Sequence, residues 1–209
     1  MGGTNDSGQR RLCLYCGSSS GSRPEFADAA AELGRTMASR GIGLVYGGGS
    51  VGLMGVAADA ALAAGGEVVG VITEQLLAAE VAHRGVTSLE VVGSMHERKA
   101  RMCDLADGFV VLPGGFGTVD EFAEMLTWNQ LGIVAKPVVL VDLHGYWAPF
   151  LDWIEHAAEL GFVRPAHRGL ARRASTVAEA IDLALHPTDA LPAKWLGATR
   201  TATFGIPEP

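Results

Sequence analysis

The stretch that decides the fold is GFVVLPGGFGTVDEF, residues 108–122. Its apolar run from Phe109 to Leu112 predicts a buried strand, and the three glycines that follow predict a tight turn. The mixed apolar and acidic pattern from Thr118 onward predicts a helix directly after that turn. A buried strand that passes through a glycine turn into a helix is typical of a parallel α/β fold.

The same alternation extends on both sides of this stretch. Strands are expected within residues 11–16, 42–46, 67–72, 88–93, 108–112 and 136–143, each of them apolar and flanked by glycine or polar residues. Helices are expected within residues 24–41, 53–66, 94–107, 118–132, 146–161 and 175–185. The segment 73–86 stays open between one helical turn and a loop.

Continuously apolar strands separated by helices indicate a sheet that is covered on both faces. No linker or change of composition interrupts residues 11–186. The sequence therefore predicts one doubly wound, Rossmann-like α/β domain with a mostly parallel sheet of about six or seven strands. Residues 1–10 are expected to form a flexible leader, and residues 187–209 a loose C-terminal tail.

Composition excludes several classes of protein. The formal charge of −7 disfavours a nucleic-acid-binding protein, which usually carries a basic face. The apolar runs are too short to span a bilayer, and the N-terminus shows no secretory signal. Three cysteines, Cys13, Cys16 and Cys103, make an odd number, which favours a reducing cytoplasm over a disulfide framework. The six histidines are scattered, so no metal site is expected.

Three glycine-rich stretches follow predicted strands, and they are CGSSSG (16–21), YGGGSVGLMG (46–55) and LPGGFGT (112–118). In a doubly wound sheet, ligands bind at the carboxyl ends of the strands, where these stretches lie. Glycine lets a ligand approach the backbone amides, and a helix that starts there presents free N–H groups, so a phosphate site is expected. Residues 47–52 also fit the dinucleotide pattern G-x-G-x-x-G, with an acid, Glu74, after the next strand.

Two S/T-x-x-E patterns bear on the charged residues near these loops. Ser94 and Glu97 predict a helix that starts at Ser94, which places Arg98 within its first turns. A cation there opposes the helix dipole unless an anion lies beside it. Thr118 and Glu121 show the same pattern, so Glu121 either caps its own helix or faces a bound ligand.

SMHERKA (94–100), PGGFGTVDE (113–121) and TWNQLG (127–132), together with GGGSVGLMG (47–55), resemble the Lonely guy family. These are cytokinin-activating nucleoside 5′-monophosphate phosphoribohydrolases, whose older label is "possible lysine decarboxylase". The resemblance covers roughly residues 11–185. It implies an enzyme that hydrolyses the N-glycosidic bond of an N6-substituted AMP, such as isopentenyladenosine monophosphate, to free base and ribose 5-phosphate. No cofactor is implied.

The resemblance also implies the site residues. Arg98 and Glu121 match the catalytic pair, and the carboxylate would stabilise positive charge on C1′ of the ribose or orient the attacking water. The family loop often ends GTLEE where this chain has GTVDE, and Asp120 keeps the charge. Substrate-binding positions are expected at Lys99, Gly114, Gly115, Phe116, Gly117, Thr118, Val119, Asp120, Thr127, Met95, Glu80, Gly47 and Gly48. Met54, Met95 and Trp128 are candidates either for the base pocket or for the core.

Other functions remain as alternatives. The decarboxylase label implies pyridoxal phosphate on a lysine, but of the three lysines only Lys99 is suitably placed, so we expect the label to be wrong. An NAD(P)-type dinucleotide-binding protein and a non-catalytic AMP-binding module both stay open. The resemblance implies a homodimer, and neither nucleic acid nor a membrane is expected as a partner.

Overall fold

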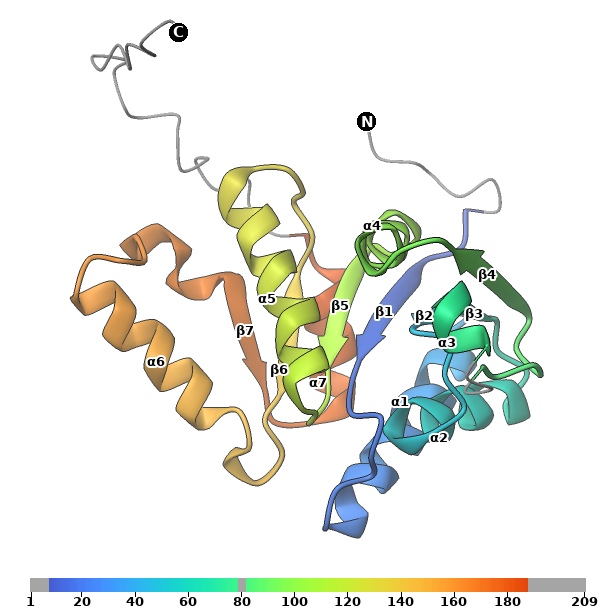
Figure 1. Cartoon of the computed structure of the whole chain (residues 1–209). Coiled ribbons are helices and arrows are strands. Elements are labelled where there is room, and N and C mark those ends of the chain that lie inside the picture. The colour runs from blue at the N-terminus through green and yellow to red at the C-terminus, as the bar shows by residue number, and fades with distance from the viewer. Residues whose placement is uncertain (1–7, 79–81, 188–209) are drawn as a thin grey trace, which may run out of the picture.

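The computed structural model describes residues 8–78 and 82–187 of the 209-residue chain. Its centre is a sheet of seven parallel strands in the order β4-β3-β2-β1-β5-β6-β7 (Figure 1). The strands are β1 Arg11–Tyr15, β2 Gly43–Tyr46, β3 Val68–Thr73, β4 Ser88–Val92, β5 Gly108–Val111, β6 Val138–Val141 and β7 Ala171–Ala174.

Helices connect the strands in chain order. They are α1 Pro24–Ser39, α2 Gly52–Ala63, α3 Glu74–Ala78, α4 Met95–Leu105, α5 Phe116–Leu131, α6 Ala148–Glu159 and α7 Val177–Leu185, with short 3₁₀ turns η1 Leu143–Gly145 and η2 Pro165–Leu170. Each of these helices is too short or too polar to cross a membrane, as far as the described residues extend.

The strand order places a switch point beside β1. The chain runs outward from β1 through β2 and β3 to β4, and then returns to lay β5 on the other side of β1. Leu12 of β1 pairs with both Leu44 of β2 and Gly108 of β5. The loops that follow β1, β2 and β5 therefore leave the same edge of the sheet next to one another, which is where doubly wound proteins bind ligands.

Two apolar clusters cover the two faces of the sheet. On β1, Leu12 and Leu14 join a cluster with α1, α2 and α7, whereas Cys13 and Tyr15 join a cluster with α4, α5 and α6. This division follows from the alternation of side chains along a strand. The arginine and the glutamate of interest, Arg98 and Glu121, both lie on helices of the second face.

Helices α1 and α2 pack closely on the first face. A Cβ atom placed on Gly34 of α1 would lie 2.2 Å from the carbonyl oxygen of Ala57 in α2. The alanine-rich sequence of α2 provides a similarly flat surface, with Ala57, Ala58 and Ala61 buried. Small residues thus allow the two helix backbones to approach each other.

The α/β class, the parallel sheet and the six expected strands are confirmed. The described residues contain a seventh strand, β7, that had no individual prediction, and the open segment 73–86 contains the short helix α3. The predicted start of a helix at Thr118 is wrong, because α5 begins at Phe116 with Gly115 as its N-cap residue. Residues 1–7 of the expected leader and 188–209 of the expected tail lie outside the described residues.

Candidate active site

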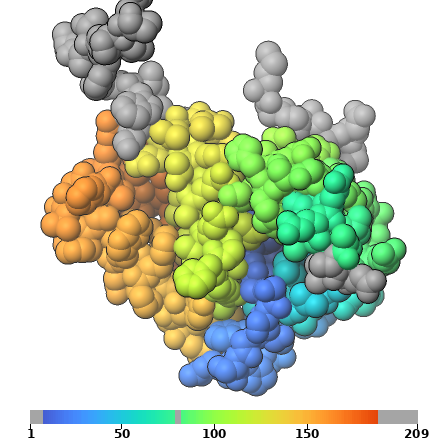
Figure 2. Space-filling view, in the orientation of Figure 1, coloured from blue at the N-terminus to red at the C-terminus, as the bar shows by residue number. Residues whose placement is uncertain are grey.

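A cleft of about 530 Å3 opens at the carboxyl edge of the sheet. Figure 2 shows the surface hollowed where the blue loop after β1, the teal α3 and the yellow-green start of α5 meet. The cleft is lined by Cys16, Ser18, Gly47, Gly49, Val51, Met54, Ile72, Leu76, Met95, Arg98, Gly115, Phe116, Gly117, Thr118, Asp120 and Glu121. All three glycine-rich stretches contribute to it, as the sequence predicts.

Arg98 lies on the first turns of α4 and is only 5% exposed. Ser94 caps this helix, since its hydroxyl accepts from the Glu97 N–H at 3.1 Å, and the Glu97 carboxylate accepts from the Gly93 N–H at 2.9 Å. The predicted helix start with Ser94 as its cap is therefore confirmed, although Glu97 reaches the N–H of Gly93 and not that of Ser94. The Arg98 guanidinium donates to the carbonyl oxygen of Val71 at 2.9 Å and to that of Gly47 at 3.1 Å.

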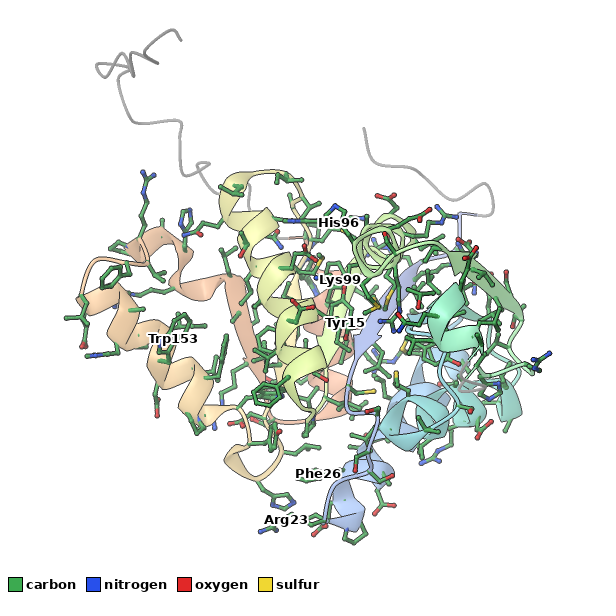
Figure 3. The ribbon with its side chains drawn as sticks, in the orientation of Figure 1. Tyr15, Arg23, Phe26, His96, Lys99 and Trp153 are labelled. Carbon is green, nitrogen blue, oxygen red and sulfur yellow. The ribbon has the colours of Figure 1, made fainter. Side chains whose placement is uncertain are left out.

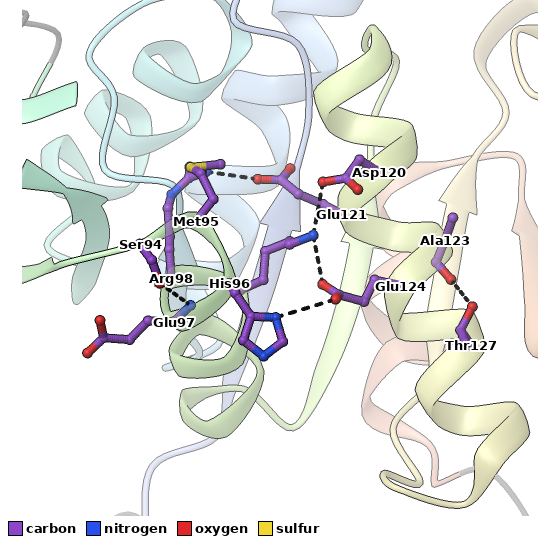
Figure 4. Close-up of polar contacts among 11 residues, drawn as sticks. Ser94, Met95, His96, Glu97, Arg98, Asp120, Glu121, Ala123, Glu124 and Thr127 are labelled. Carbon is purple, nitrogen blue, oxygen red and sulfur yellow. Dashed lines mark hydrogen bonds and ion pairs between the residues drawn. The ribbon is translucent and has the colours of Figure 1, made fainter. Parts of the chain in front are cut away.

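Glu121 faces Arg98 and not the end of its own helix (Figure 4). Because α5 starts at Phe116, Glu121 lies beyond the first turn and cannot cap it. Its carboxylate Oε1 lies 3.2 Å from Nη1 of Arg98, and the two side chains are 12% and 7% exposed. The question that the sequence leaves open, cap or ligand contact, is thus decided against the cap.

The burial of Glu121 changes its acidity. Burial raises its pKa to about 7, although Arg98 opposes the rise; Asp120 raises the pKa further and Lys99 lowers it. Both the protonated and the ionised carboxyl are consequently populated near neutral pH. A carboxyl with such a pKa in a cleft is a frequent mark of a functional site.

The N-terminus of α5, whose first N–H groups have no partner within the helix, borders the cleft. A Cβ atom added to Gly115 or Gly117 would meet nothing within 4 Å, so both positions have free space above them. Gly114 is the opposite case, because a Cβ there would lie 2.1 Å from Oγ1 of the buried Thr118. The Tyr146 hydroxyl donates to the Gly114 carbonyl at 2.6 Å. The turn is thus fixed from beneath and open above, as an anion site at a helix N-terminus requires.

The G-x-G-x-x-G stretch serves contacts within the protein. A Cβ atom on Gly47 would lie 1.8 Å from Nη2 of Arg98, and one on Gly52 would lie 2.3 Å from the carbonyl carbon of Ser18. Glu74, the acid that completes the dinucleotide pattern, is exposed at the start of α3 and does not line the cleft. These glycines therefore have a packing reason that does not involve a dinucleotide.

Not every expected substrate position lies in the cleft. Those that line it are Gly47, Met95, Gly115, Phe116, Gly117, Thr118 and Asp120, and those that do not are Gly48, Lys99, Gly114, Val119 and Thr127. The Thr127 hydroxyl donates to the Ala123 carbonyl at 2.9 Å, and this residue lines a separate cavity between α5 and α6. Glu80 lies outside the described residues.

Several cleft residues had no individual prediction. Cys16 and Ser18 come from the CGSSSG stretch, whose composition and place after a strand were the available signal. Ile72 and Leu76 come from the end of β3 and from α3, where an apolar residue gives no functional signal. Three residues were candidates either for the base pocket or for the core. Met54 and Met95 line the cleft, whereas Trp128 packs against the core beneath α5.

The lysines are engaged in ways that do not suit pyridoxal phosphate. Burial alone would lower the pKa of Lys99, but its hydrogen bonds to Glu124 and Asp120 raise it above the ordinary value. A Schiff-base lysine needs the reverse shift. Lys136 donates to the Cys103 carbonyl at 2.6 Å, away from the cleft, and Lys194 lies outside the described residues. Within the described ranges, no group of three His, Cys, Asp or Glu residues is placed to hold a metal ion.

Comparisons with known proteins agree with this geometry. A family model described as "Possible lysine decarboxylase" matches residues 54–184. A rice protein (Oryza sativa subsp. japonica), the probable cytokinin riboside 5′-monophosphate phosphoribohydrolase LOGL9, is 50% identical over 169 residues, which are 81% of this chain and 74% of that protein. The rice cytokinin riboside 5′-monophosphate phosphoribohydrolase LOG is 46% identical over 172 residues, 82% of this chain and 71% of that protein.

Among solved structures, the molybdenum cofactor binding protein of Rippkaea orientalis matches with a TM-score of 0.64. The match covers 84% of this chain and 94% of that one at 24% identity, and at that identity it shows the fold alone. The sequence matches reach further, since they extend over most of the chain and include the segments that carry Arg98 and Glu121. The chain therefore belongs to the Lonely guy family of cytokinin riboside 5′-monophosphate phosphoribohydrolases.

Proposed function

We propose that this protein hydrolyses the N-glycosidic bond of AMP or an N6-substituted AMP, such as isopentenyladenosine monophosphate. The products are the free base and ribose 5-phosphate. One observation carries the proposal: the buried Arg98–Glu121 pair, 3.2 Å apart, lies in the same cleft as the open N-terminus of α5. A nucleoside monophosphate carries a phosphate, which suits the N-terminus of α5, and a glycosidic carbon, which suits the Arg98–Glu121 pair. The activity named for the relatives at 43–50% identity supports the same reaction.

The reaction builds positive charge on C1′ as the bond to the base breaks. The Glu121 carboxylate stabilises that charge or orients the water that attacks C1′. Water supplies the hydroxyl group on C1′, and the departing base gains the proton. Arg98 favours the ionised form of Glu121, because its guanidinium lowers the pKa that burial raises.

Substrate placement follows from the two ends of the cleft. The amides at Gly115 and Gly117 hold the 5′-phosphate at the positive end of the α5 dipole. Binding energy from this remote group places C1′ against Glu121. Met54, Ile72 and Met95 provide an apolar wall for the base and its substituent.

The central test is Glu121→Gln, which keeps the size of the side chain and removes its charge. We expect base release from isopentenyl-AMP to fall by about 10²–10³-fold, the usual loss for one preorganised electrostatic group. Released base is measured by chromatography, with circular dichroism to check folding. Glu74→Gln is the matched control, because this exposed acid lies off the cleft and should leave the rate unchanged.

Three results would contradict the proposal. The first is a Glu121→Gln protein that turns over like the wild type. The second is tight AMP binding without any base released, which would indicate a non-catalytic AMP-binding module. The third is an NAD(P) requirement, which would indicate the dinucleotide alternative.

The proposal extends to the assembly and the compartment. We propose a homodimer in the cytoplasm, which binds neither nucleic acid nor a membrane. Large apolar side chains exposed on and after α6, at Trp153, Leu160 and Phe162, support association. Trp153 is labelled on α6 in Figure 3. The free thiols of all three cysteines support a reducing compartment. Light scattering of the purified protein measures the oligomeric state, and a monomer at micromolar concentration would count against the dimer.

A further inference from the structure

Beside the Arg98–Glu121 pair lies a second contact between the same two helices. Lys99 follows Arg98 on α4, and its Nζ lies 3.0 Å from Oδ2 of Asp120 and 2.9 Å from Oε2 of Glu124. Asp120 precedes Glu121 on α5, so consecutive residues of α4 pair with consecutive residues of α5 (Figure 4). The two contacts form parallel links between the helices that carry the proposed catalytic groups.

Lys99 is fully engaged in this link. Its side chain is 12% exposed, and it does not line the cleft. Asp120 and Glu124 lie four residues apart on one face of α5, where like charges repel each other unless a cation lies between them. Lys99 supplies that cation, and its position between α4 and α5 is visible in Figure 3.

We propose that Lys99 is a positioning residue, which joins α4 to α5 through Asp120 and Glu124 and thereby sets the contact between Arg98 and Glu121. It does not bind substrate. This role rests on the proposed function, because it gives Lys99 an effect on the reaction that passes through Glu121.

The charged residues around Glu121 allow the role of Lys99 to be tested through the pKa of Glu121. Arg98 and Lys99 face Glu121 from α4, and Asp120 lies next to it on α5. Cys13 and Tyr15 face it from β1, and Cys16 from the position directly after β1. Burial raises the pKa of Cys13, Tyr15 and Cys16, so these three groups stay neutral. Changes in the pKa of Glu121 therefore come from the three charged residues of the helices.

The sign of each change follows from these charges. Ionised Glu121 is the active form and its pKa is about 7, so kcat/KM of the wild type should fall as the pH drops below about 7. Lys99 lowers this pKa, so Lys99→Met should move the acid limb to higher pH. Asp120 raises the pKa, so Asp120→Asn should move the limb to lower pH.

The experiment measures kcat and KM for isopentenyl-AMP from pH 5.5 to 9. We expect Lys99→Met to lose roughly three- to tenfold in kcat/KM at pH 6 and less than about twofold at pH 9, which is a shift of the acid limb by about half to one pH unit. Lys99→Arg should retain most of the wild-type profile, because it keeps the cation. Arg101→Met is the matched control, because it also removes a cation from α4. The partner of Arg101 is Glu90 of β4, so the acid limb of the pH profile should not move.

Two outcomes would overturn the inference. A Lys99→Met loss by one factor at every pH would indicate a structural role only. A KM for isopentenyl-AMP raised at every pH, with the limb unmoved, would indicate a substrate contact.

A readout that needs no turnover separates this inference from the proposed function. Protein labelled with 13C at the glutamate carboxyl groups gives one resonance that disappears in Glu121→Gln and so belongs to Glu121. Its titration midpoint should rise in Lys99→Met. A protein that releases no base disproves the proposed function, while this titration still decides the role of Lys99. A protein that releases base but shows an unmoved midpoint disproves only the role of Lys99.

Discussion

Arg98 is held by the sheet before it contacts Glu121. Its guanidinium donates to the carbonyl groups of Gly47, which directly follows β2, and of Val71, which lies within β3. A buried cation needs such partners, because an unpaired charge in the interior is strongly destabilising. Two backbone acceptors and one carboxylate therefore fix where the positive charge lies in the cleft.

Gly47→Ala tests that placement. The added methyl group would lie 1.8 Å from Nη2 of Arg98, so the guanidinium must leave its carbonyl partner. We expect base release to fall by about 10²-fold, since displacement of a catalytic group by about 1 Å has effects of that order. Steady-state kinetics measures the loss.

The control for this variant is Gly169→Ala, where an added Cβ meets nothing within 4 Å and which lies outside the cleft. It should behave as the wild type. A Gly47→Ala enzyme with the wild-type rate would show that the position of Arg98 matters little.

The sequence predicted the N-cap residue of α4 correctly and that of α5 incorrectly. Ser94 caps α4 as expected, but Thr118, which has Glu121 at the same spacing, does not cap α5. The pattern alone cannot show where a helix begins, and here Gly115 takes the cap position three residues earlier. Glu121 was predicted as a site residue from the family resemblance, whereas its contact with Arg98 depends on how two distant helices pack. Its catalytic role stays a prediction.

Among the helices, α1 and α2 depend on small residues where they meet. A Cβ on Gly34 would lie 2.2 Å from the carbonyl oxygen of Ala57 and 2.8 Å from the amide nitrogen of Ala61. Both neighbours are backbone atoms, so no side chain can rotate away. The helices would have to separate.

Gly34→Ala should therefore lower the free energy of unfolding by about 1–3 kcal/mol, the usual cost of an overpacked core. The gain of about 1 kcal/mol from better helix propensity opposes this loss without exceeding it. Urea denaturation followed by circular dichroism measures the difference, again against Gly169→Ala. A Gly34→Ala protein as stable as the wild type would show that the two helices can adjust.

The sequence did not predict the strand β7 or the side of α5 on which Thr127 lies. β7 is a four-residue edge strand with the sequence ARRA, whose central arginines hide the apolar signal of a strand. Thr127 lies in the predicted helix, yet six residues after Glu121 it points to a different side of that helix. A sequence motif can include both Glu121 and Thr127, but it does not show which of the two faces the cleft.

For the whole molecule, the alternation of strands and helices was enough to predict a doubly wound sheet and the edge where the site lies. The strand order was not predictable, because each connection permits placement on either side of the existing sheet. The cleft needs that order, since it joins loops from β1, β2 and β5 with the starts of α4 and α5. The limits of the domain at residues 11 and 186 stay a prediction.

A ligand that joins so many segments should stabilise the entire fold. With Glu121→Gln, AMP at about 100 times its dissociation constant should add about 2.7 kcal/mol, because it binds only the folded protein. For a chain of this size that corresponds to a rise in Tm of about 5–10 °C. Differential scanning fluorimetry measures the shift.

Adenosine is the comparison ligand, because it lacks the phosphate that the Gly115 and Gly117 amides are proposed to hold. At the same concentration it should give a clearly smaller shift. Equal shifts with AMP and adenosine would place the phosphate outside the glycine turn.

Arg98 and Glu121 are both buried, but they affect the stability of the fold in opposite ways. Arg98 donates hydrogen bonds to the Gly47 and Val71 carbonyl groups, whereas the folded protein disfavours the Glu121 carboxylate, whose pKa rises from 4.5 to about 7. Stability from this group therefore falls as the pH rises through that interval and stays low above it. A descendant freed from selection for catalysis should lose the glutamate early and keep the arginine long after. Among distant relatives, the acid is then the better marker of retained chemistry.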